Sequence, residues 1–278
     1  MRIWFTRAVL AAGLAAVVSL AVIPAVLQGQ AGRGAAPAAR VPRTADGKPN
    51  LNGIWQTFGG ANWNLEDHSA AAGPFFQEGA IGAIPAGQSV LEGGGDIPYT
   101  PAALAKRNEN ARNRLTLDPE VKCYMPGIPR AHYMPYPFQI VQSPQNILFA
   151  YEYASANRVV NMGKPTEAPV DSWMGWSNGK WEGDTLVVDV TGLNGNAWLD
   201  RAGNYTTDST HVVERFTLTD ADHINYEATI EDPKLFTKPW KIQVTLYKHM
   251  EKNFQLLEFK CVEFAEEMLY GHLRKRYN

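Results

Sequence analysis

The first candidate for chemistry is Glu214, an acidic residue in an otherwise apolar alternating pattern. In HVVERFTL (211–218) the residues that share a face with it are Val212, Phe216 and Leu218, because successive side chains of a strand point to opposite sides of the sheet. A carboxylate among apolar neighbours is desolvated and could serve as a general acid or base. An ion pair with an internal arginine is the alternative. His211 falls on the other face, so this His-x-x-Glu spacing does not predict a metal site.

The second candidate is the proline-rich segment CYMPGIPRAHYMPYP (123–137), which ends where the first long strand pattern begins. Its four prolines restrict the backbone, so Arg130, His132 and Tyr133 would be held rigidly at the mouth of a strand. Histidine exchanges protons near neutral pH, and arginine binds carboxylates through a forked contact. We therefore predict His132 as a second acid or base, with Arg130 and Tyr133 as ligand-binding residues. The alternative is a stiff loop whose arginine and histidine bond backbone carbonyls.

Aromatic residues in two strand patterns could line a pocket. In ILFAYEYA the alternation places Ile147, Phe149, Tyr151 and Tyr153 on one face, which suits either a core rim or an amphipathic pocket wall. Arg158 follows a turn and could pair with Glu152 or orient a polar ligand. The predicted ligand-binding residues are Arg130, Tyr133, Phe149, Tyr151, Tyr153, Arg158 and Phe216.

Three tryptophans, Trp173, Trp176 and Trp181, lie within nine residues. On one exposed face they would form a stacking platform for sugar rings or aromatic ligands. Packed inward, they would close one end of a barrel, which is the commoner environment of tryptophan.

These residues must be positioned mainly by β-structure. From Pro137 onward the apolar period is two, in PFQIVQ, NILFAYEYA, RVVNM, TLVVDVT, HVVERFTLT, HINYEATIE, WKIQVTLYKH and FQLLEFKCVEF. Eight short strands separated by turn sequences predict an all-β, antiparallel up-and-down barrel, because closure removes the edges of the sheet. A β-sandwich is the alternative. One short helix over 100–115, capped by Thr100 with Pro101 in its first turn, and a glycine-rich loop or lid over 62–98 complete the expectation.

The sequence GKWEGDTLVVDVT is interpreted as a hairpin without catalytic groups. Residues 179–184 form the predicted turn, in which Gly179 and Gly183 supply unusual backbone angles and Asp184 bonds its own turn amides. The residues predicted to face inward are Leu186, Val188 and Val190.

The ends of the chain indicate export. A basic head and an apolar run over residues 1–31 predict a signal peptide or an N-terminal membrane anchor. Residues 32–49 are predicted to form a flexible linker, and residues 50–278 are predicted to form a single β-barrel domain. Net charge is −2, and no basic stripe predicts nucleic-acid binding. The only two cysteines, Cys123 and Cys261, predict one disulfide in an oxidising compartment; two buried thiols are the alternative.

Several segments together resemble a broad family of uncharacterised exported bacterial proteins. They are PRTADGKPNLNGIW, DPEVKCYMPGIPR, PFQIVQ, WMGWSNGKWEGDTLVVDVTGLN, WLDRAG, HVVERF and IEDPKLFTKPW. The shared signatures are GKWEGDTLVVD and DPxxxCxxPGxPR. The resemblance implies an exported single β-domain and brings no established activity. Separately, Gly53-x-Trp55 at the start of an antiparallel meander is similar to the start of the lipocalin (calycin) fold.

Three functions are compatible with these observations. The first is an exported, periplasmic or secreted protein that binds a small apolar or aromatic molecule, without a cofactor or metal and with membrane contact only through the possible anchor. The second is a cofactor-independent lyase, isomerase or hydrolase that uses Glu214 or His132 as acid or base. The third is an accessory protein of the cell envelope.

Overall fold

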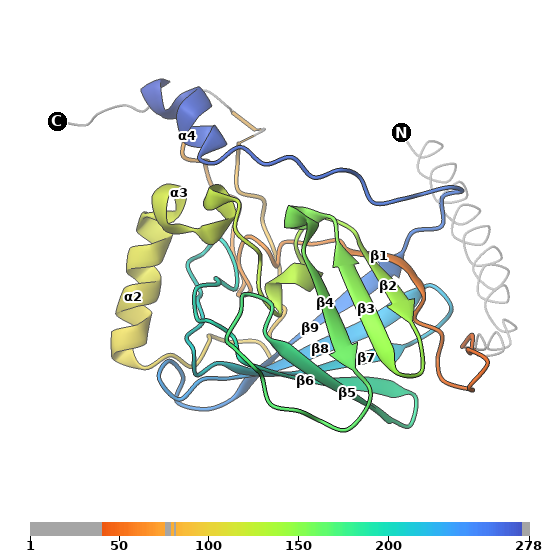
Figure 1. Cartoon of the computed structure of the whole chain (residues 1–278). Helices are drawn as coiled ribbons and strands as arrows, with labels where there is room; N and C mark the ends of the chain where they lie inside the picture. Colours follow the sequence, from red (N-terminus) through yellow and green to blue (C-terminus); the bar gives the residue numbers. More distant parts are fainter. Residues whose placement is uncertain (1–40, 76–78, 81, 274–278) are drawn as a thin grey trace, which may run out of the picture. The chain divides into compact units, whose positions relative to one another are not determined.

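Nine strands form a closed β-barrel in the computed structural model, which describes residues 41–75, 79–80 and 82–273. Each strand pairs with the next along the chain, and the last pairs with the first (Figure 1). The strands are β1 (Gly53–Thr57), β2 (Phe138–Gln142), β3 (Asn146–Tyr151), β4 (Asn157–Asn161), β5 (Trp176–Glu182), β6 (Thr185–Thr191), β7 (His211–Leu218), β8 (His223–Glu231) and β9 (Trp240–Lys248). The predicted all-β barrel is confirmed, with nine strands rather than eight, and the sandwich alternative is excluded.

One strand pairing differs from the predicted antiparallel order. β4 and β5 run parallel and share only two register pairs, Val160 with Ser177 and Asn161 with Asn178. The reason is the connection between them: residues 162–175 cross over and return the chain in its original direction, whereas a tight hairpin would have reversed it. The barrel is therefore closed at this point by its shortest ladder.

The inward faces follow the predicted alternation. Along β7 every second residue, from Val212 to Leu218, is buried, and the register places Phe216 opposite Tyr226 on β8. In β6 the predicted inward residues Leu186, Val188 and Val190 are fully buried. Burying these apolar side chains stabilises the barrel by roughly 1.5–3 kcal/mol for each large residue.

β5 is a strand that the sequence interpretation took for a turn. The hairpin between β5 and β6 turns at Gly183 and Asp184 alone, because Glu182 already pairs with Thr185. Gly183 has the positive φ expected of it, +59°. Gly179 instead lies inside the strand, where an added Cβ would come within 2.5 Å of both Met162 and Val160. This glycine permits close packing rather than a bend.

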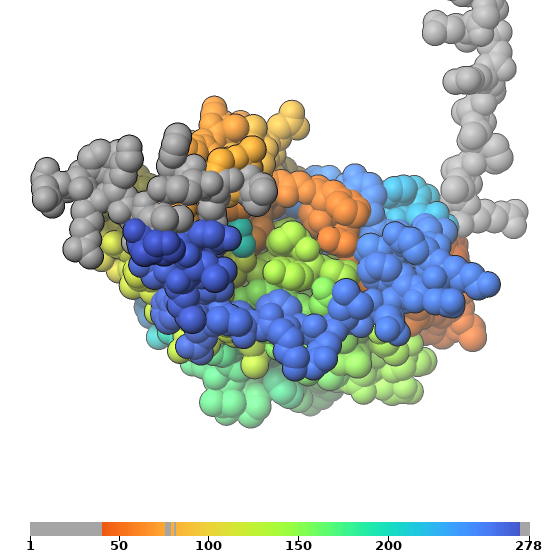
Figure 2. All heavy atoms as spheres, turned by 90° about the horizontal axis from the view of Figure 1, so that it is seen from above, coloured from red at the N-terminus to blue at the C-terminus, as the bar shows by residue number. Residues whose placement is uncertain are grey.

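The prediction that FQLLEFKCVEF forms a strand is wrong. It lies in an extended stretch without regular structure, residues 249–264, which we call the C-terminal strap (Figure 1). Since β9 already pairs with β1, no sheet edge is left for it. The strap is fixed by contacts along its length: the Leu257 amide donates to Glu152, and the Phe259 ring packs 4.8 Å from that of Tyr153. Figure 2 shows the C-terminal part of the chain as a continuous band over this side of the molecule.

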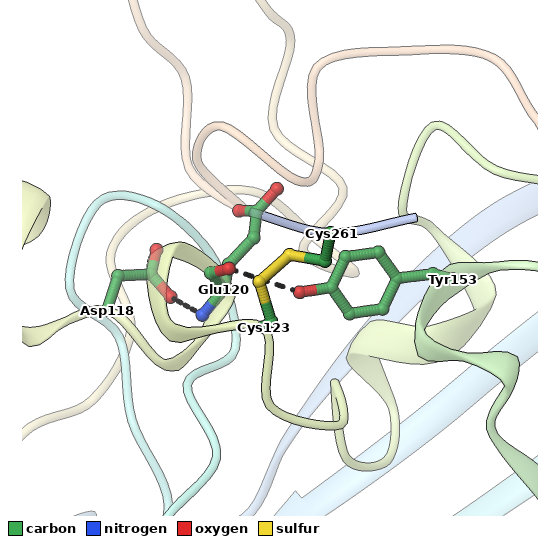
Figure 3. The surroundings of a disulfide bond; sticks show 5 residues. All are labelled: Asp118, Glu120, Cys123, Tyr153 and Cys261. Carbon is green, nitrogen blue, oxygen red and sulfur yellow. Dashed lines mark hydrogen bonds between the residues drawn. A yellow bond between two sulfur atoms is a disulfide. The ribbon is translucent and has the colours of Figure 1, made fainter. Parts of the chain in front are cut away.

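The predicted disulfide is confirmed. Cys123 and Cys261 are bonded, with Cα atoms 5.9 Å apart and a sequence separation of 138 residues. The bond joins the strap to the turn after a 3₁₀ helix, η2 (Pro119–Lys122), close to Glu120 and Tyr153 (Figure 3). A disulfide of this kind is typical of an oxidising compartment.

In the part of the chain that the structure describes, helices are short and few, and the α-helices lie beside the barrel (Figure 1). They are α2 (Pro101–Arg112), α3 (Arg114–Leu117), α4 (Ala265–Tyr270) and the 3₁₀ turns η3 (Arg130–His132), η4 (Tyr153–Ser155) and η5 (Gly271–Leu273). Thr100 caps α2 by accepting from the Ala103 amide, as predicted. The predicted single helix is interrupted at Asn113, whose φ and ψ leave the helical region. Among the described residues no helix is both long and apolar enough to span a bilayer.

The compact unit begins at Val41, so residues 41–49 differ from the predicted flexible linker. Arg43 and Pro49 form a bridge across a short turn. Arg43 also makes two hydrogen bonds, of 2.9 and 2.6 Å, to the carboxylate of Asp184 on the β5–β6 turn. Asp184 thus binds the loop of residues 41–49 through Arg43 instead of bonding its own turn amides. The predicted signal or anchor, and linker residues 32–40, lie outside the described residues.

Candidate functional site

Glu214 lies inside the barrel and makes an ion pair. Arg158 of β4 donates from Nη1 to Oε2 of Glu214 over 2.7 Å, and Tyr226 of β8 donates its hydroxyl to Oε1 over 2.7 Å. The side chains of Glu214 and Arg158 are 0% and 2% exposed. The sequence left two interpretations of this carboxylate, a desolvated acid or base and an ion pair with an internal arginine. The structure shows the ion pair. Nε of Arg158 is buried and has no hydrogen-bond partner among the described residues.

His132 enters the same interior from η3. Its ring lies 4.7–5.6 Å from the rings of five aromatic residues, Phe138, Phe149, Tyr151, Phe216 and Tyr226. Nε2 is 3.0 Å from the Tyr151 hydroxyl. Nδ1 is 3.2 Å from Oε1 of Glu214 but is not aligned for a hydrogen bond.

Electrostatics keep this histidine neutral. Burial lowers the pKa of His132 well below its usual value, and the nearby charge of Arg158 lowers it further. Burial also raises the pKa of Tyr151, so its hydroxyl stays protonated. Nη2 of Arg158, which can only donate, lies 3.4 Å from Nε2 of His132, so Nε2 is an acceptor for both Arg158 and the Tyr151 hydroxyl. A neutral ring that accepts at Nε2 carries its proton on Nδ1, facing the Glu214 carboxylate.

The two predicted catalytic residues are therefore brought together but enclosed. The side chains of His132 and Glu214 are both 0% exposed, so neither can touch a substrate unless the barrel opens. Their acid–base role stays a prediction. The geometry supports a structural role, in which a neutral ring and a paired carboxylate complete the packing of the interior.

The predicted ligand-binding residues separate into two groups. Phe149, Tyr151 and Phe216 line the barrel interior as buried rings, as the alternation implied. Tyr153 does not share their face, because β3 ends at Tyr151 and the chain turns into η4. Its hydroxyl donates to the Glu120 carbonyl over 3.3 Å (Figure 3). The predicted pair of Glu152 and Arg158 is wrong too: Glu152 bonds the strap, while Arg158 turns inward.

Arg130 belongs to a second polar cluster, whereas Tyr133 is part of the hydrophobic core. Arg130 donates to Asn62 over 2.9 Å, to Asp118 over 3.0 Å and to Glu120 over 2.7 Å. The predicted anion clamp thus holds two of the protein's own carboxylates. Tyr133 is buried and donates its hydroxyl to the Leu199 carbonyl over 2.8 Å.

Glu120 is held in its charged form by this cluster. Burial alone would raise its pKa, but Arg130 and Arg201 outweigh burial and lower the pKa from 4.5 to about 2. Arg201 donates from Nε to Glu120 over 2.7 Å. Acid is therefore needed to break the link between η2 and the loop that carries Arg201.

We predict that the stabilising effect of Glu120 is lost in acid. Because its pKa is lower in the folded chain than in the unfolded one, the effect is complete above pH 5 and fades as the pH falls towards 2. The difference in unfolding free energy between the wild type and Glu120→Gln should shrink by about 3 kcal/mol over this range. Urea denaturation at several pH values measures it. Glu182→Gln, which alters an exposed carboxylate, should show only a small difference throughout, because solvent screens its ion pairs. A Glu120→Gln difference that does not vary with pH would contradict the prediction.

An open groove lies where the barrel wall is weakest. Because the β4–β5 ladder covers two residue pairs, the preceding residues of β4 have no partner on β5. A groove of about 780 Å³ occupies this place, the largest that we describe. Its lining includes Asn157, Arg158 and Val159 of β4, Trp173 and Met174 of the crossing connection, and Trp176 at the start of β5. We call it the β4–β5 groove.

Of the predicted ligand-binding residues, Arg158 is the one that lines this groove. The three clustered tryptophans of the sequence did indicate this region. Two of them, Trp173 and Trp176, are half-buried and line the groove. Asn157 and Val159 were not predicted, because they lie on the outward face of β4 and an alternating pattern indicates pocket residues only on the inward face. Only the parallel closure of the barrel, which local periodicity does not reveal, makes this outward face part of a site.

No protein-family model matches the chain, and no curated protein shows significant similarity to it. Within the described residues, no group of three or more histidine, cysteine, aspartate or glutamate side chains is arranged to hold a metal ion. The β4–β5 groove presents aromatic rings, thioethers and neutral amides at the rim of the barrel.

Proposed function

We propose that the protein is an exported small-molecule-binding protein and that its ligand lies in the β4–β5 groove. The single observation that carries the proposal is the groove: its volume of about 780 Å³ falls in the range of small-molecule sites, roughly 300–1,000 Å³. Trp173, Trp176 and Met174 supply an apolar surface, and the amide of Asn157 supplies a directional group. Export is supported by the disulfide and by the signal-like N-terminal sequence.

The scaffold suits this role. Strands position ligand-binding residues more rigidly than loops do, and both sides of the groove are anchored. On one side, Arg158 is fixed by its buried bond to Glu214. On the other, Trp176 donates its indole N–H to Thr166 over 3.1 Å. A ligand entering between them would lose little affinity to reordering of the protein.

Native mass spectrometry of the full chain purified from its host's periplasm tests the proposal. We expect a retained molecule that is released on denaturation. The variant Trp176→Ala should retain it at least tenfold more weakly, by about 1.4 kcal/mol or more. Trp181→Ala is the matched control, since this half-buried tryptophan of β5 lies outside the groove, near Lys48. Equal retention by both variants would place the ligand elsewhere and contradict the proposal.

A further inference from the structure

A second groove adjoins the first across Trp173. It has a volume of about 570 Å³ and is lined by Leu117, Lys122, Tyr124, Asn196 and Trp198 as well as by Trp173. Since Trp173 lines both grooves, the two are neighbours along one surface. The Tyr124 ring lies 5.2 Å from that of Trp173, tilted by 40°, so an aromatic ridge separates them.

The ridge is held in place. Tyr124 directly follows Cys123, whose disulfide to Cys261 fixes the backbone at this point. Trp173 is half-buried against the hydrophobic core. A ridge of fixed rings between two hollows offers stacking faces to a ligand made of several linked rings, one after another.

The polar groups of both grooves are mainly neutral amides. Asn146, Asn157, Asn161 and Asn194 line the β4–β5 groove, and Asn196 lines the second one. The side-chain amides of Asn146 and Asn157 bond no other described residue, and both residues are exposed. An amide both donates and accepts, which matches a hydroxyl group.

The charged side chains of the two grooves are either already paired within the protein or occur singly. The Arg158 guanidinium is neutralised by Glu214, so it cannot serve as the main contact of an anionic ligand. Asp171 in the first groove and Lys122 in the second have opposite signs. No cluster of basic groups lines either groove, as a phosphate or a polyanion would need.

We infer that the ligand is a neutral oligosaccharide that stacks on Trp176, Trp173 and Tyr124 and spans both grooves. This rests on the proposed function and adds the ligand's chemical class and length to it. The apolar faces of sugar rings match the indole and phenol rings, and their hydroxyls match the asparagine amides. A purely apolar aromatic molecule would instead cover the amides of Asn146 and Asn157 without giving them partners, which costs free energy.

Calorimetric titration of the full chain tests the inference with neutral glucose and N-acetylglucosamine oligomers of one to six units. Oligogalacturonates serve as the anionic probe and 2-naphthol as the apolar aromatic probe. We expect affinity for one neutral series to rise at least tenfold between the disaccharide and the tetrasaccharide, as the second groove fills. Tyr124→Ala should remove this gain with chain length, whereas Asn157→Leu should weaken binding of the disaccharide and of the tetrasaccharide at least tenfold. Trp181→Ala is the control and should bind as the wild type does.

The outcomes separate the two proposals. Binding of 2-naphthol that Trp176→Ala abolishes, without binding of any neutral saccharide, overturns the inference and leaves the proposed function standing. Tighter binding of the anionic oligomers, or saccharide affinity that does not depend on length, also overturns it. If no probe binds and native mass spectrometry finds no retained molecule, both proposals fail.

Discussion

Replacing Glu214 by leucine is expected to lower the free energy of unfolding by about 3–5 kcal/mol. The loss arises because Arg158 would remain charged inside the barrel, where its side chain is 2% exposed. Tyr226 would lose the acceptor of its hydroxyl in the same step. Urea denaturation of the full chain, followed by circular dichroism, measures the change.

The double variant Arg158→Leu/Glu214→Leu separates an unpaired charge from simple loss of packing. Removing both members of a buried ion pair is commonly far less costly than removing one. We therefore expect the double variant to recover most of the stability that Glu214→Leu loses. Glu182→Leu is the matched control, because this glutamate is half-exposed in its contact with Arg215 and its loss should cost far less than the loss of Glu214. A double variant no more stable than Glu214→Leu would show that the pair itself holds the barrel together.

The strands that could be predicted are those whose alternation is decided by burial. In β7 and β8 one face is fully buried, so the apolar period in HVVERFTL and HINYEATIE directly reflects the fold. β5 escaped prediction because Gly179 replaces an apolar residue on its buried face, where Met162 and Val160 leave no room for a side chain. The strap shows the reverse case: its alternation is present, but strand formation also needs a free sheet edge, and β9 and β1 already pair.

The site was less predictable because it depends on contacts between distant segments. The pattern around Glu214 indicated a desolvated carboxylate, a candidate acid or base with an internal ion pair as the alternative. Nothing local in the sequence shows that its partner is Arg158, which is 56 residues away in the chain and 2.7 Å away in space. Arg130 illustrates the same limit, since the proline-rich segment predicted its rigidity but not that Asp118 and Glu120 occupy its donors. The β4–β5 groove arises from the parallel return of the chain, a property of topology rather than of residue pattern.

Removing the disulfide is expected to have an effect of similar size. The variant Cys123→Ser/Cys261→Ser should lower the free energy of unfolding by about 2–5 kcal/mol. Chain entropy places the loss towards the upper end of this range, because the bond closes a loop with a sequence separation of 138 residues. Urea denaturation of the variant and of the wild type, without reductant, measures the loss.

The part of this loss that comes from release of the strap depends on the strap's other contacts. The strap begins at His249, whose amide donates to the Ile54 carbonyl on β1. Near Cys261 its other contacts are the Leu257 amide bond to Glu152, the Phe259 ring against Tyr153 and Tyr136, and the Phe264 amide bond to the Val121 carbonyl. These few contacts should not keep it in place alone, so we expect trypsin to cleave the variant after the exposed Lys260 at least tenfold faster than the wild type. Reductant should produce the same change in the wild type and none in the variant. Equal cleavage rates would mean that the ring contacts suffice, and that the disulfide acts on the unfolded chain rather than on the strap.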